Sequence, residues 1–320
     1  MLLGTWNLEN LYRPGGAFGP RSEAAYKAKL TALASVVTEL DPTLLGVQEV
    51  GDPEALADLA GMLDGDWHIA LSEHPDSRGI RVGFLSRPEP RTIIDTNAFP
   101  APLRPVQGDD DGEPVSRTGR GFLATEITTQ GMALTVAVCH LKSKLLTFPG
   151  GRFQPRNEGE RARYGAYALY RRAAEATTLR ALADDLLDGK GKERNVAVLG
   201  DLNDEVAAAT TQILQGPPGS EIGTPGFERP DQGDAARLWN IAPLIPEEQR
   251  FSRVHSGRPE LIDHILVSRL LLDRVTGAGT GTGTGTPVRE TPLPSVDGNP
   301  GARRDTAGSD HAPVWARIEP

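Results

Sequence analysis

Short apolar runs separated by polar turns dominate this chain, and few segments have the spacing of a helix. Runs of about four to eight residues rich in Val, Ile and Leu predict β-strands. We expect single strands over Leu2–Leu8, Thr43–Gln48, Trp67–Leu71, Ile80–Leu85, Thr92–Thr96, Asn195–Leu199 and Val314–Ile318. We expect paired strands over Phe122–Thr128 with Met132–His140, joined at Gln130-Gly131, and over Phe251–His255 with Leu261–Val267.

Three segments are predicted to be helices. Residues Glu23–Leu40 have helical periodicity and stop before Asp41-Pro42, because the residue before a proline disfavours helical backbone. Residues Pro53–Leu63 follow Asp52, a favourable N-cap, and carry proline at the first helical position. The longest segment is Glu160–Leu187.

The remaining segments predict loops around one domain. Residues Pro100–Gly119 and Gly216–Asp234 are polar and rich in glycine and proline, and the Gly-Thr repeat over Gly277–Thr286 predicts a flexible low-complexity loop. Many short strands with few, widely spaced helices predict two packed sheets with helices outside, in the α/β class. We find neither an internal repeat nor a clean boundary, so residues 1–320 are interpreted as a single domain.

Composition limits the choice of partners and compartment. The net charge of -9 argues against binding nucleic acid through bulk electrostatics, so attraction to phosphate must be local or come from a bound cation. Cys139 is the single cysteine, which excludes an intramolecular disulfide. We find neither a leader peptide nor an apolar run of about 18 residues, which a membrane span needs. These features predict a cytoplasmic protein, with a processed secreted form as the alternative; the oligomeric state stays open.

Polar residues lie at the ends of five predicted strands, four after the strand and one before it. These segments are Asn7-Leu8-Glu9-Asn10, Gln48-Glu49, His140-Leu141-Lys142-Ser143-Lys144, Asp201-Leu202-Asn203-Asp204 and Ser309-Asp310-His311. A sixth strand carries Asp263 inside an apolar run. Buried carboxylates are costly unless they are paired or hold a metal ion. The pattern therefore predicts a polar site shared by several strands.

The residue types suggest how such a site would work. Hard cations such as Mg²⁺ prefer oxygen ligands, and Glu9, Glu49 and Asp310 suit that role. Asp201 and Asn203 lie two residues apart on a segment expected to be extended, so they would share one face. An acid there can orient an attacking water, and an amide can hold a phosphate oxygen.

The two histidines complete the expected chemistry. His140 and His311 would stabilise charge developing on phosphorus or assist the leaving group. Asp263 would orient one of the two imidazoles by a hydrogen bond.

The six segments in this order resemble the endonuclease/exonuclease/phosphatase superfamily, which has the DNase I-like fold. The resemblance runs from Asn7 to His311, nearly the whole chain; each segment alone is weakly specific, but six in order are strongly specific. It implies a four-layer α/β sandwich, two packed and mainly antiparallel β-sheets flanked by helices, with a metal site at one mouth.

The resemblance also implies roles for individual residues. Asn7, Glu9, Glu49 and Asp310 correspond to the set that holds the metal ion, Mg²⁺ or Mn²⁺, and positions the phosphate. Asp201 corresponds to the residue that activates water, with Asn203 beside it, and His311 to the histidine that contacts the scissile phosphate. Asp263 corresponds to an acid that orients a histidine, either His140 or His311. Abasic-site nucleases have tyrosine at the position of His140, so the histidine points to the DNase I and sphingomyelinase branches.

Plainer interpretations exist for each segment taken alone. Glu49 suits a strand-ending surface acid, and Asp201-Leu202-Asn203-Asp204 suits a turn. His264 is expected to be a packed or surface histidine, and His68, His74 and His255 have no supporting context. To exclude a shared site, such a plain interpretation would have to be correct for all six segments at once. We therefore favour a single functional site.

Five basic residues are candidates for substrate contacts. Lys142 and Lys144 suit either phosphate contacts or a solvated strand end. Arg152 and Arg156 open an arginine-rich stretch that suits either a helix face paired with acids or a positive rim; we favour the rim because it follows His140. Arg81 is within reach of the site if it is not simply a strand-end arginine.

The leading hypothesis is a Mg²⁺- or Mn²⁺-dependent phosphodiesterase that acts on DNA or another nucleic acid by in-line attack of water. The alternative enzyme is a phosphomonoesterase, or a hydrolase of a phospholipid or small metabolite. The aromatic share of 5% favours this alternative slightly, because few aromatic rings leave few platforms for stacking bases. A catalytically inactive binding module is the hypothesis of another class.

Overall fold

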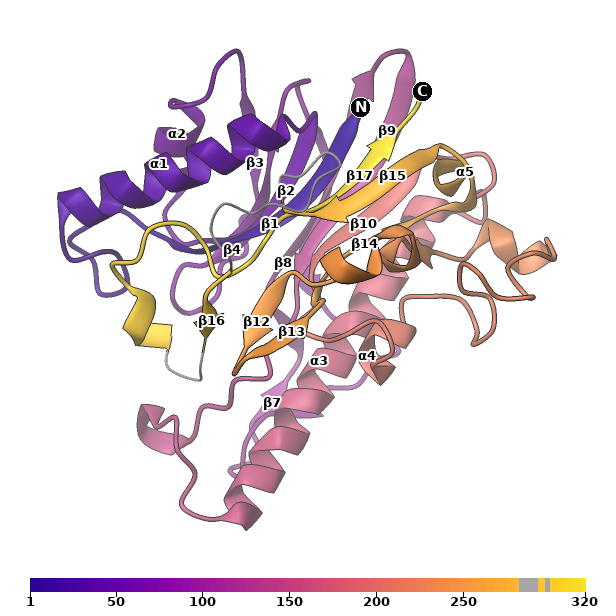
Figure 1. Cartoon of the computed structure of the whole chain (residues 1–320). Helices are drawn as coiled ribbons and strands as arrows, with labels where there is room; N and C mark the ends of the chain where they lie inside the picture. The colour runs from indigo at the N-terminus through magenta and orange to yellow at the C-terminus, as the bar shows by residue number, and fades with distance from the viewer. Residues whose placement is uncertain (282–292, 297–299) are drawn as a thin grey trace.

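Two β-sheets pack face to face and helices cover their outer faces, giving the four-layer α/β sandwich that the sequence predicted (Figure 1). The computed structural model describes residues 1–281, 293–296 and 300–320. The first sheet has the order β15 (Val275–Thr280), β17 (Val314–Ile318), β1 (Leu2–Leu11), β2 (Leu44–Val50), β4 (Arg81–Ser86) and β3 (His68–Leu71). The second has the order β11 (Trp239–Asn240), β14 (Asp263–Val267), β10 (Val196–Asp201), β9 (Met132–His140), β8 (Arg117–Thr129) and β5 (Arg91–Ala98).

Each large sheet is antiparallel except at one central pair of strands. β1 pairs in parallel with β2 in the first sheet, and β9 pairs in parallel with β10 in the second. The carboxyl ends of parallel neighbours lie at the same edge of a sheet. The two pairs therefore bring four of the polar segments to two sheet edges.

The apolar faces of the two sheets form the central core. Leu44 and Phe84 of the first sheet belong to one buried cluster with Val138, Leu199 and Ile265 of the second. The sheets approach so closely at Gly46 that a Cβ atom there would overlap the Leu199 side chain. The close packing of the two sheets therefore explains why β2 has a glycine at position 46.

Two helices cover the first sheet and one long helix covers the second (Figure 1). α1 (Glu23–Leu40) has the predicted bounds, since Ser22 caps its start and Asp41 leaves the helix with a φ of 45°. α2 (Pro53–Ala60) has the predicted cap, Asp52, but ends before the predicted Leu63. α3 (Glu158–Leu187) starts after Asn157, whose side chain caps it. The short helices are α4 (Ala209–Gln212) and α5 (Arg269–Leu272).

The predicted hairpin between β8 and β9 is confirmed. Gln130 and Gly131 form its tip with φ angles of 51° and 78°. Positive φ at both central residues is the geometry of a two-residue turn whose twist matches the flanking strands. Thr129 consequently faces Met132 and the two strands pair along their length.

Two predictions about strands were wrong. The segments Phe251–His255 and Leu261–Val267 do not pair with each other: β12 (Arg253–His255) pairs with β13 (Arg258–Glu260) and with β16 (Ser295–Val296), whereas β14 pairs with β10 and β11. β14 is buried throughout, so its apolar side chains gain more in the second sheet than beside the half-exposed β12. The predicted loop over Pro100–Gly119 contains two short strands, β6 (Val106–Gln107) and β7 (Pro114–Val115), and the first residues of β8.

The prediction of a loop over the Gly-Thr repeat was wrong for its first residues. Gly277–Thr280 belong to β15, which pairs with β17, while residues 282–286 lie outside the described residues. Gly279 lies opposite Trp315, and a Cβ atom at that position would come within 2.5 Å of the indole ring. The glycine is therefore needed to make room for a buried tryptophan.

Replacing Gly279 with alanine should destabilise the fold by about 1–3 kcal/mol, the usual cost of overpacking a filled site. Gly277 provides the matched control, because the nearest atoms to a Cβ there are 3.9 Å away. Thermal unfolding should show a clear loss for Gly279→Ala and little change for Gly277→Ala. Equal unfolding temperatures for the two variants would contradict this account of β15.

Within the described part of the chain, no helix combines enough length with enough apolar character to cross a membrane.

Candidate active site

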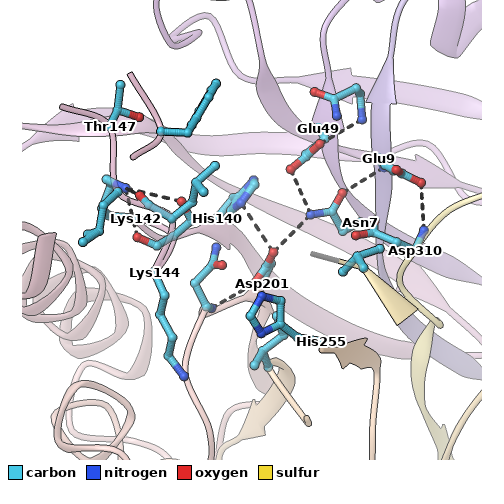
Figure 2. Close-up of a pocket in the computed structure, with 18 of the residues that line it drawn as sticks. Asn7, Glu9, Glu49, His140, Lys142, Lys144, Thr147, Asp201, His255 and Asp310 are labelled. Atoms are coloured by element: carbon cyan, nitrogen blue, oxygen red, sulfur yellow. Dashed lines mark hydrogen bonds and ion pairs between the residues drawn. The ribbon is translucent and has the colours of Figure 1, made fainter. Parts of the chain in front are cut away.

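The polar strand ends meet at one cavity of about 1300 Å³. In Figure 2, Asp201 lies between Lys142 and His140 on one side and Glu49, Asn7, Glu9 and Asp310 on the other. The predicted residues that line this cavity are Asn7, Glu9, Glu49, His140, Lys142, Lys144, Asp201, Asn203, Asp310 and His311. Asp263 lies behind the lining, where it contacts His311.

Irregular backbone turns several of these side chains into the cavity. The β1–β2 register shifts between Asn7 and Leu11, and four site residues have left-handed φ angles: Glu9 at 51°, Asn10 at 52°, Glu49 at 61° and Asn203 at 53°. Non-glycine residues adopt this conformation rarely, and such residues concentrate where function requires them. The irregular backbone at these strand ends therefore determines where the four side chains point.

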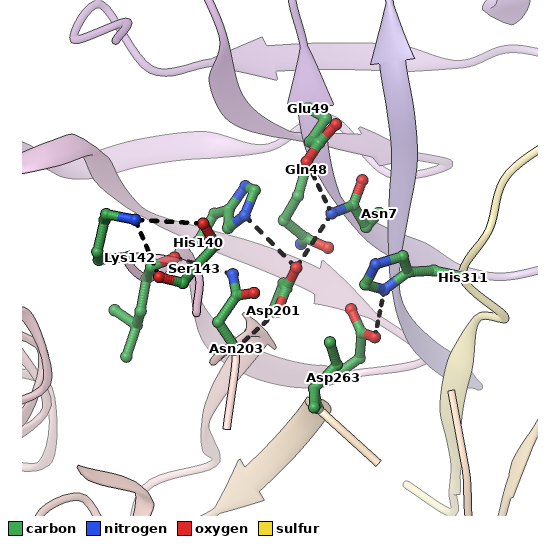
Figure 3. A network of polar contacts seen from close by, with 12 residues as sticks. Asn7, Gln48, Glu49, His140, Lys142, Ser143, Asp201, Asn203, Asp263 and His311 are labelled. Carbon is green, nitrogen blue, oxygen red and sulfur yellow. Dashed lines mark hydrogen bonds and ion pairs between the residues drawn. The ribbon is translucent and has the colours of Figure 1, made fainter. Parts of the chain in front are cut away.

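Asp201 is the centre of the polar network (Figure 3). Its Oδ2 accepts a hydrogen bond from Asn7 Nδ2 at 3.1 Å and lies 3.4 Å from His140 Nε2. Burial, and then the nearby carboxylate of Asp263, raise the pKa of Asp201 to about 7. A carboxylate with such a pKa accepts a proton from water more readily than an exposed aspartate does.

Asn203 does not lie on an extended segment with Asp201, contrary to the prediction. The backbone N–H of Asn203 donates to Asp201 Oδ1 at 2.8 Å, which forms an Asx turn after β10. Asn203 Nδ2 donates to the carbonyl of Leu141 at 2.9 Å, so the next strand end holds the amide in place. The segment therefore forms the turn that the plainer interpretation predicted, and its Asp201 and Asn203 also line the cavity.

Asp263 contacts His311 and not His140. Its Oδ2 lies 2.7 Å from His311 Nδ1, and both side chains are buried (Figure 3). Burial alone would lower the pKa of His311, but the carboxylates of Asp263 and Asp310 outweigh it and raise the pKa to about 10. His311 is therefore an imidazolium held by a carboxylate.

His140 is in the opposite electrostatic state. Burial, assisted by the charges of Arg120 and His311, holds the pKa of His140 well below its usual value. The ring is consequently neutral, next to Asp201. One cavity thus contains a neutral and a charged imidazole on either side of a buried acid.

The acidic residues differ in whether a cation already pairs with them. Both Glu9 oxygens accept hydrogen bonds from Arg303, at 2.5 and 2.8 Å, and Asp310 lies 3.6 Å from Arg253. Glu49 has no Lys, Arg or His within ion-pair distance among the described residues. Its oxygens accept hydrogen bonds from Asn7 Nδ2 and from the Asn10 backbone N–H.

Comparison with known proteins identifies this arrangement. The model of the endonuclease/exonuclease/phosphatase family matches residues 4–311. The chain belongs to the endonuclease/exonuclease/phosphatase family. Members of this family are metal-dependent phosphoric ester hydrolases, and so is this chain.

Solved structures with the same fold include other members of the family. Truncated TDP2 from Caenorhabditis elegans has a TM-score of 0.55 at 14% identity, covering 98% of this chain and 96% of that one. A mannosyl-6-phosphatase from Bacteroides thetaiotaomicron has a TM-score of 0.55 at 15% identity, covering 100% and 99%. A family protein from the same organism has a TM-score of 0.56 at 15% identity, covering 99% and 93%. No curated protein matches the chain.

The divalent cation on which the family depends fits Glu49 best. Asp201, Asp263 and His311 also place ligand atoms within 4.8 Å of one another, but His311 Nδ1 and Asp263 Oδ2 already contact each other at 2.7 Å, and both Asp201 oxygens accept hydrogen bonds. Glu49 offers a carboxylate without a cationic partner among the described residues, and hard cations prefer such oxygens.

Two of the other expected ligands fit the cation less well. Asn7 directs its amide nitrogen toward Glu49 and Asp201, while its oxygen accepts from the Glu9 backbone N–H. A nitrogen donor of this kind suits a phosphate oxygen and not a cation. Glu9 is already neutralised by Arg303.

The expected basic contacts divide into two groups. Lys142 and Lys144 line the cavity of this hydrolase, although Lys144 also lies 3.1 Å from Asp204. Arg81, Arg152 and Arg156 are not among the lining residues. Arg152 pairs instead with Glu160 at 2.8 Å, and neither Arg152 nor Arg156 lies on α3. Further along the same arginine-rich stretch, Arg161 and Arg171 do line the cavity.

Several lining residues were missed by the sequence interpretation. They are Phe18, Arg78, Arg120, Phe153, His255 and Arg303. All six lie outside the six polar segments, so tertiary packing alone brings them to the cavity. His264, in contrast, is packed as expected: its ring nitrogens contact Asn240 Nδ2 and the carbonyl of Asp204.

Proposed function

We propose that this hydrolase is a Mg²⁺- or Mn²⁺-dependent phosphodiesterase that cleaves nucleic acid strands, with DNA as the first candidate. The observation that carries the proposal is the meeting of a buried acid, an imidazolium and an unpaired carboxylate in one cavity whose mouth holds exposed aromatic rings. In-line hydrolysis needs a base for water, positive charge near the phosphate and a place for the rest of the substrate.

Asp201 is the proposed base. Its raised pKa suits proton transfer from water, and Asn7 and His140 hold its Oδ2 from two sides. The Asx turn with Asn203 fixes its other oxygen. The proton removed from water would pass to Asp201 as the new oxygen–phosphorus bond forms. The bond from phosphorus to the leaving oxygen of the strand would break on the opposite side, and that oxygen would take up a proton from solvent.

His311 is the proposed electrostatic partner of the phosphate. As an imidazolium it presents a donor whose orientation is set by Asp263, and its charge offsets the charge that grows on the phosphoryl oxygens. The second N–H of the Asn203 amide supplies a further donor. Glu49 would hold the divalent cation, which supplies positive charge beside the phosphate when bound.

Exposed aromatic rings favour a nucleic acid strand as the substrate. Phe18 and Phe153 line the same cavity and are 47% and 46% exposed. Every base has a face that can stack on such a ring, and stacking stabilises single strands by about 1–3 kcal/mol per base. The low aromatic content therefore matters less than where these two rings lie.

A substrate panel tests the proposal. The purified protein would be assayed with Mg²⁺ and with Mn²⁺ on single-stranded oligonucleotides, plasmid DNA, RNA, phosphomonoesters and sphingomyelin, with Asp201→Ala as the inactive control. We expect metal-dependent cleavage of an oligonucleotide that the control lacks. Turnover of phosphomonoesters or sphingomyelin with no cleavage of any nucleic acid would refute the proposed substrate.

Substrate affinity should weaken above neutral pH because of Lys142. Burial, and then Arg171, lower the pKa of this ammonium to about 8. The group is charged below that pKa and neutral above it, so KM for an oligonucleotide should rise as pH increases from about 7 to about 9. The rise should be smaller in Lys142→Gln, measured by initial rates at saturating metal. The same pH profile in both proteins would exclude Lys142 as the cause.

A further inference from the structure

Four cationic side chains line the cavity around His140: the charges of three of them act on its ring, and that of the fourth, Arg171, acts on Lys142. Arg78, Arg120, Lys142 and Arg171 come from four different segments and all line the cavity. Asp201, the proposed base, lies between Lys142 and the acidic residues Glu49 and Asp310 (Figure 2). We call these four residues the basic wall.

The basic wall carries more positive charge than its acidic contacts neutralise. Asp76 lies 3.3 Å from Arg120 and 3.7 Å from Arg78, and Glu175 lies 3.1 Å from Arg171. Four cations therefore face two carboxylates in direct contact. The surplus matches the charge of a phosphate group.

Arg120 has a hydrogen-bond donor left over. Its side chain is 12% exposed, and its Nε is buried without a hydrogen-bond partner. A buried donor without a partner is costly unless a ligand or water satisfies it. The charge of Arg120 acts on both His140 and Lys142, whose pKa values it lowers together with burial. Arg120 is thus close to the site and short of an acceptor.

Glu175 fixes the basic wall in place from behind. This residue of α3 is 1% exposed, and it accepts hydrogen bonds from the backbone N–H groups of Gly119 at 2.8 Å and Lys142 at 2.5 Å. It also accepts from Arg171 Nε at 3.1 Å. One buried carboxylate therefore ties together three of the segments that carry the wall, so little ordering would be needed when an anion binds.

We propose that the basic wall is a second phosphate subsite, which binds the phosphate next to the scissile one on a nucleic acid strand. This inference rests on the proposed function and extends it. The strand would place the scissile phosphate at Asp201 and His311 and the neighbouring phosphate against Arg120 and Arg171. Recognition of two successive phosphates would make the enzyme favour strands over substrates with a single phosphate.

The first experiment measures anion binding without catalysis. Titration calorimetry with inorganic phosphate in EDTA removes the contribution of a divalent cation. The wild-type protein should bind phosphate, and Arg120→Gln with Arg171→Gln together should weaken binding at least about tenfold, since hydrogen bonds between charged groups are stronger than those between neutral groups. Equal affinity in the wild type and this double variant would overturn the subsite, whether or not the enzyme cleaves nucleic acid.

The second experiment uses the reaction itself. Thymidine dinucleotides without an end phosphate, with a 5′-phosphate and with a 3′-phosphate would be compared by kcat/KM. We expect the wild type to prefer one phosphorylated form about tenfold, or ~1.4 kcal/mol, and the double variant to lose the preference. The matched control is Arg91→Gln, whose exposed guanidinium pairs with Glu126 at 2.8 Å and does not line the cavity.

The outcomes separate this inference from the proposed function. Absence of any diester cleavage, with phosphate binding lost in the double variant, would refute the proposed function and support an anion site. Cleavage with the same preference in the wild type and the double variant would refute the subsite and leave the proposed function intact.

Discussion

Replacing Asp201 with asparagine should lower kcat by about 10³-fold, within the range that a positioned general base contributes. Asparagine keeps the shape and the acceptor oxygen for the Asn203 N–H, but it cannot take a proton from water. KM should change little, because the substrate contacts proposed for His311 and the basic wall remain. Steady-state kinetics on the oligonucleotide of the panel, at saturating Mg²⁺ or Mn²⁺, would measure both constants.

The same variant should not lose stability. The pKa of Asp201 rises from 3.8 to about 7 on folding, so the charged carboxylate is disfavoured in the fold and its cost grows as pH rises through that interval. Asparagine removes this cost at about pH 7.5, and this gain offsets the hydrogen bond from Asn7 Nδ2 that is lost when an NH2 group replaces Oδ2. Thermal unfolding in EDTA should therefore give a temperature at least as high as that of the wild type. A large drop would mean that lost activity reflects a damaged fold, and activity close to that of the wild type would remove Asp201 from the mechanism.

Replacing Glu49 with glutamine should weaken binding of the divalent cation by at least about 100-fold. Changes to residues that only support metal ligands cost about 10–100-fold, and the loss of a charged ligand should cost no less. Glutamine retains one acceptor oxygen, so it can keep the hydrogen bond from the Asn10 backbone N–H at 2.8 Å but loses the longer one from Asn7 Nδ2 at 3.3 Å. Calorimetric titration with Mn²⁺, and the Mg²⁺ concentration that gives half-maximal activity, would measure the effect.

The variant Glu9→Gln tests whether Glu9, rather than Glu49, is the main ligand of the cation. Arg303 already neutralises Glu9, so this variant should affect cation affinity much less than Glu49→Gln. Glu54→Gln, on the exposed first turn of α2, serves as the control for the loss of one negative charge. If Glu9→Gln weakened the cation more than Glu49→Gln did, the assignment of the metal ligand would have to be reversed.

Local sequence signals predicted well those helices and turns whose bounds depend only on neighbouring residues. The bounds of α1 follow from periodicity and from Asp41-Pro42, and the β8–β9 hairpin follows from Gln130-Gly131. Partners distant in sequence were harder to predict. β14 has no local feature that selects β10 over β12, and only the burial of the whole strand decides its place.

Only those site residues that lie at the ends of apolar strands could be predicted from the sequence. Asp201 and Glu49 end apolar runs and His311 shortly precedes one, so all three were visible in the sequence. Arg120 and Arg303 belong to segments without a distinctive pattern, and nothing local indicates that they reach the same cavity. The orientation of the Asn7 amide likewise depends on neighbours from other strands.

The position of β17 between β15 and β1 has a consequence during synthesis of the protein. The first strand made, β1, has β2 on one side and waits for one of the last strands made on the other. Asp310 and His311 immediately precede β17, so they reach the cavity only as that strand docks. A nascent chain in which β17 has not yet docked would hold Asn7 and Asp201 but lack His311 at the cavity, so the site would be complete only once this strand pairs with β1.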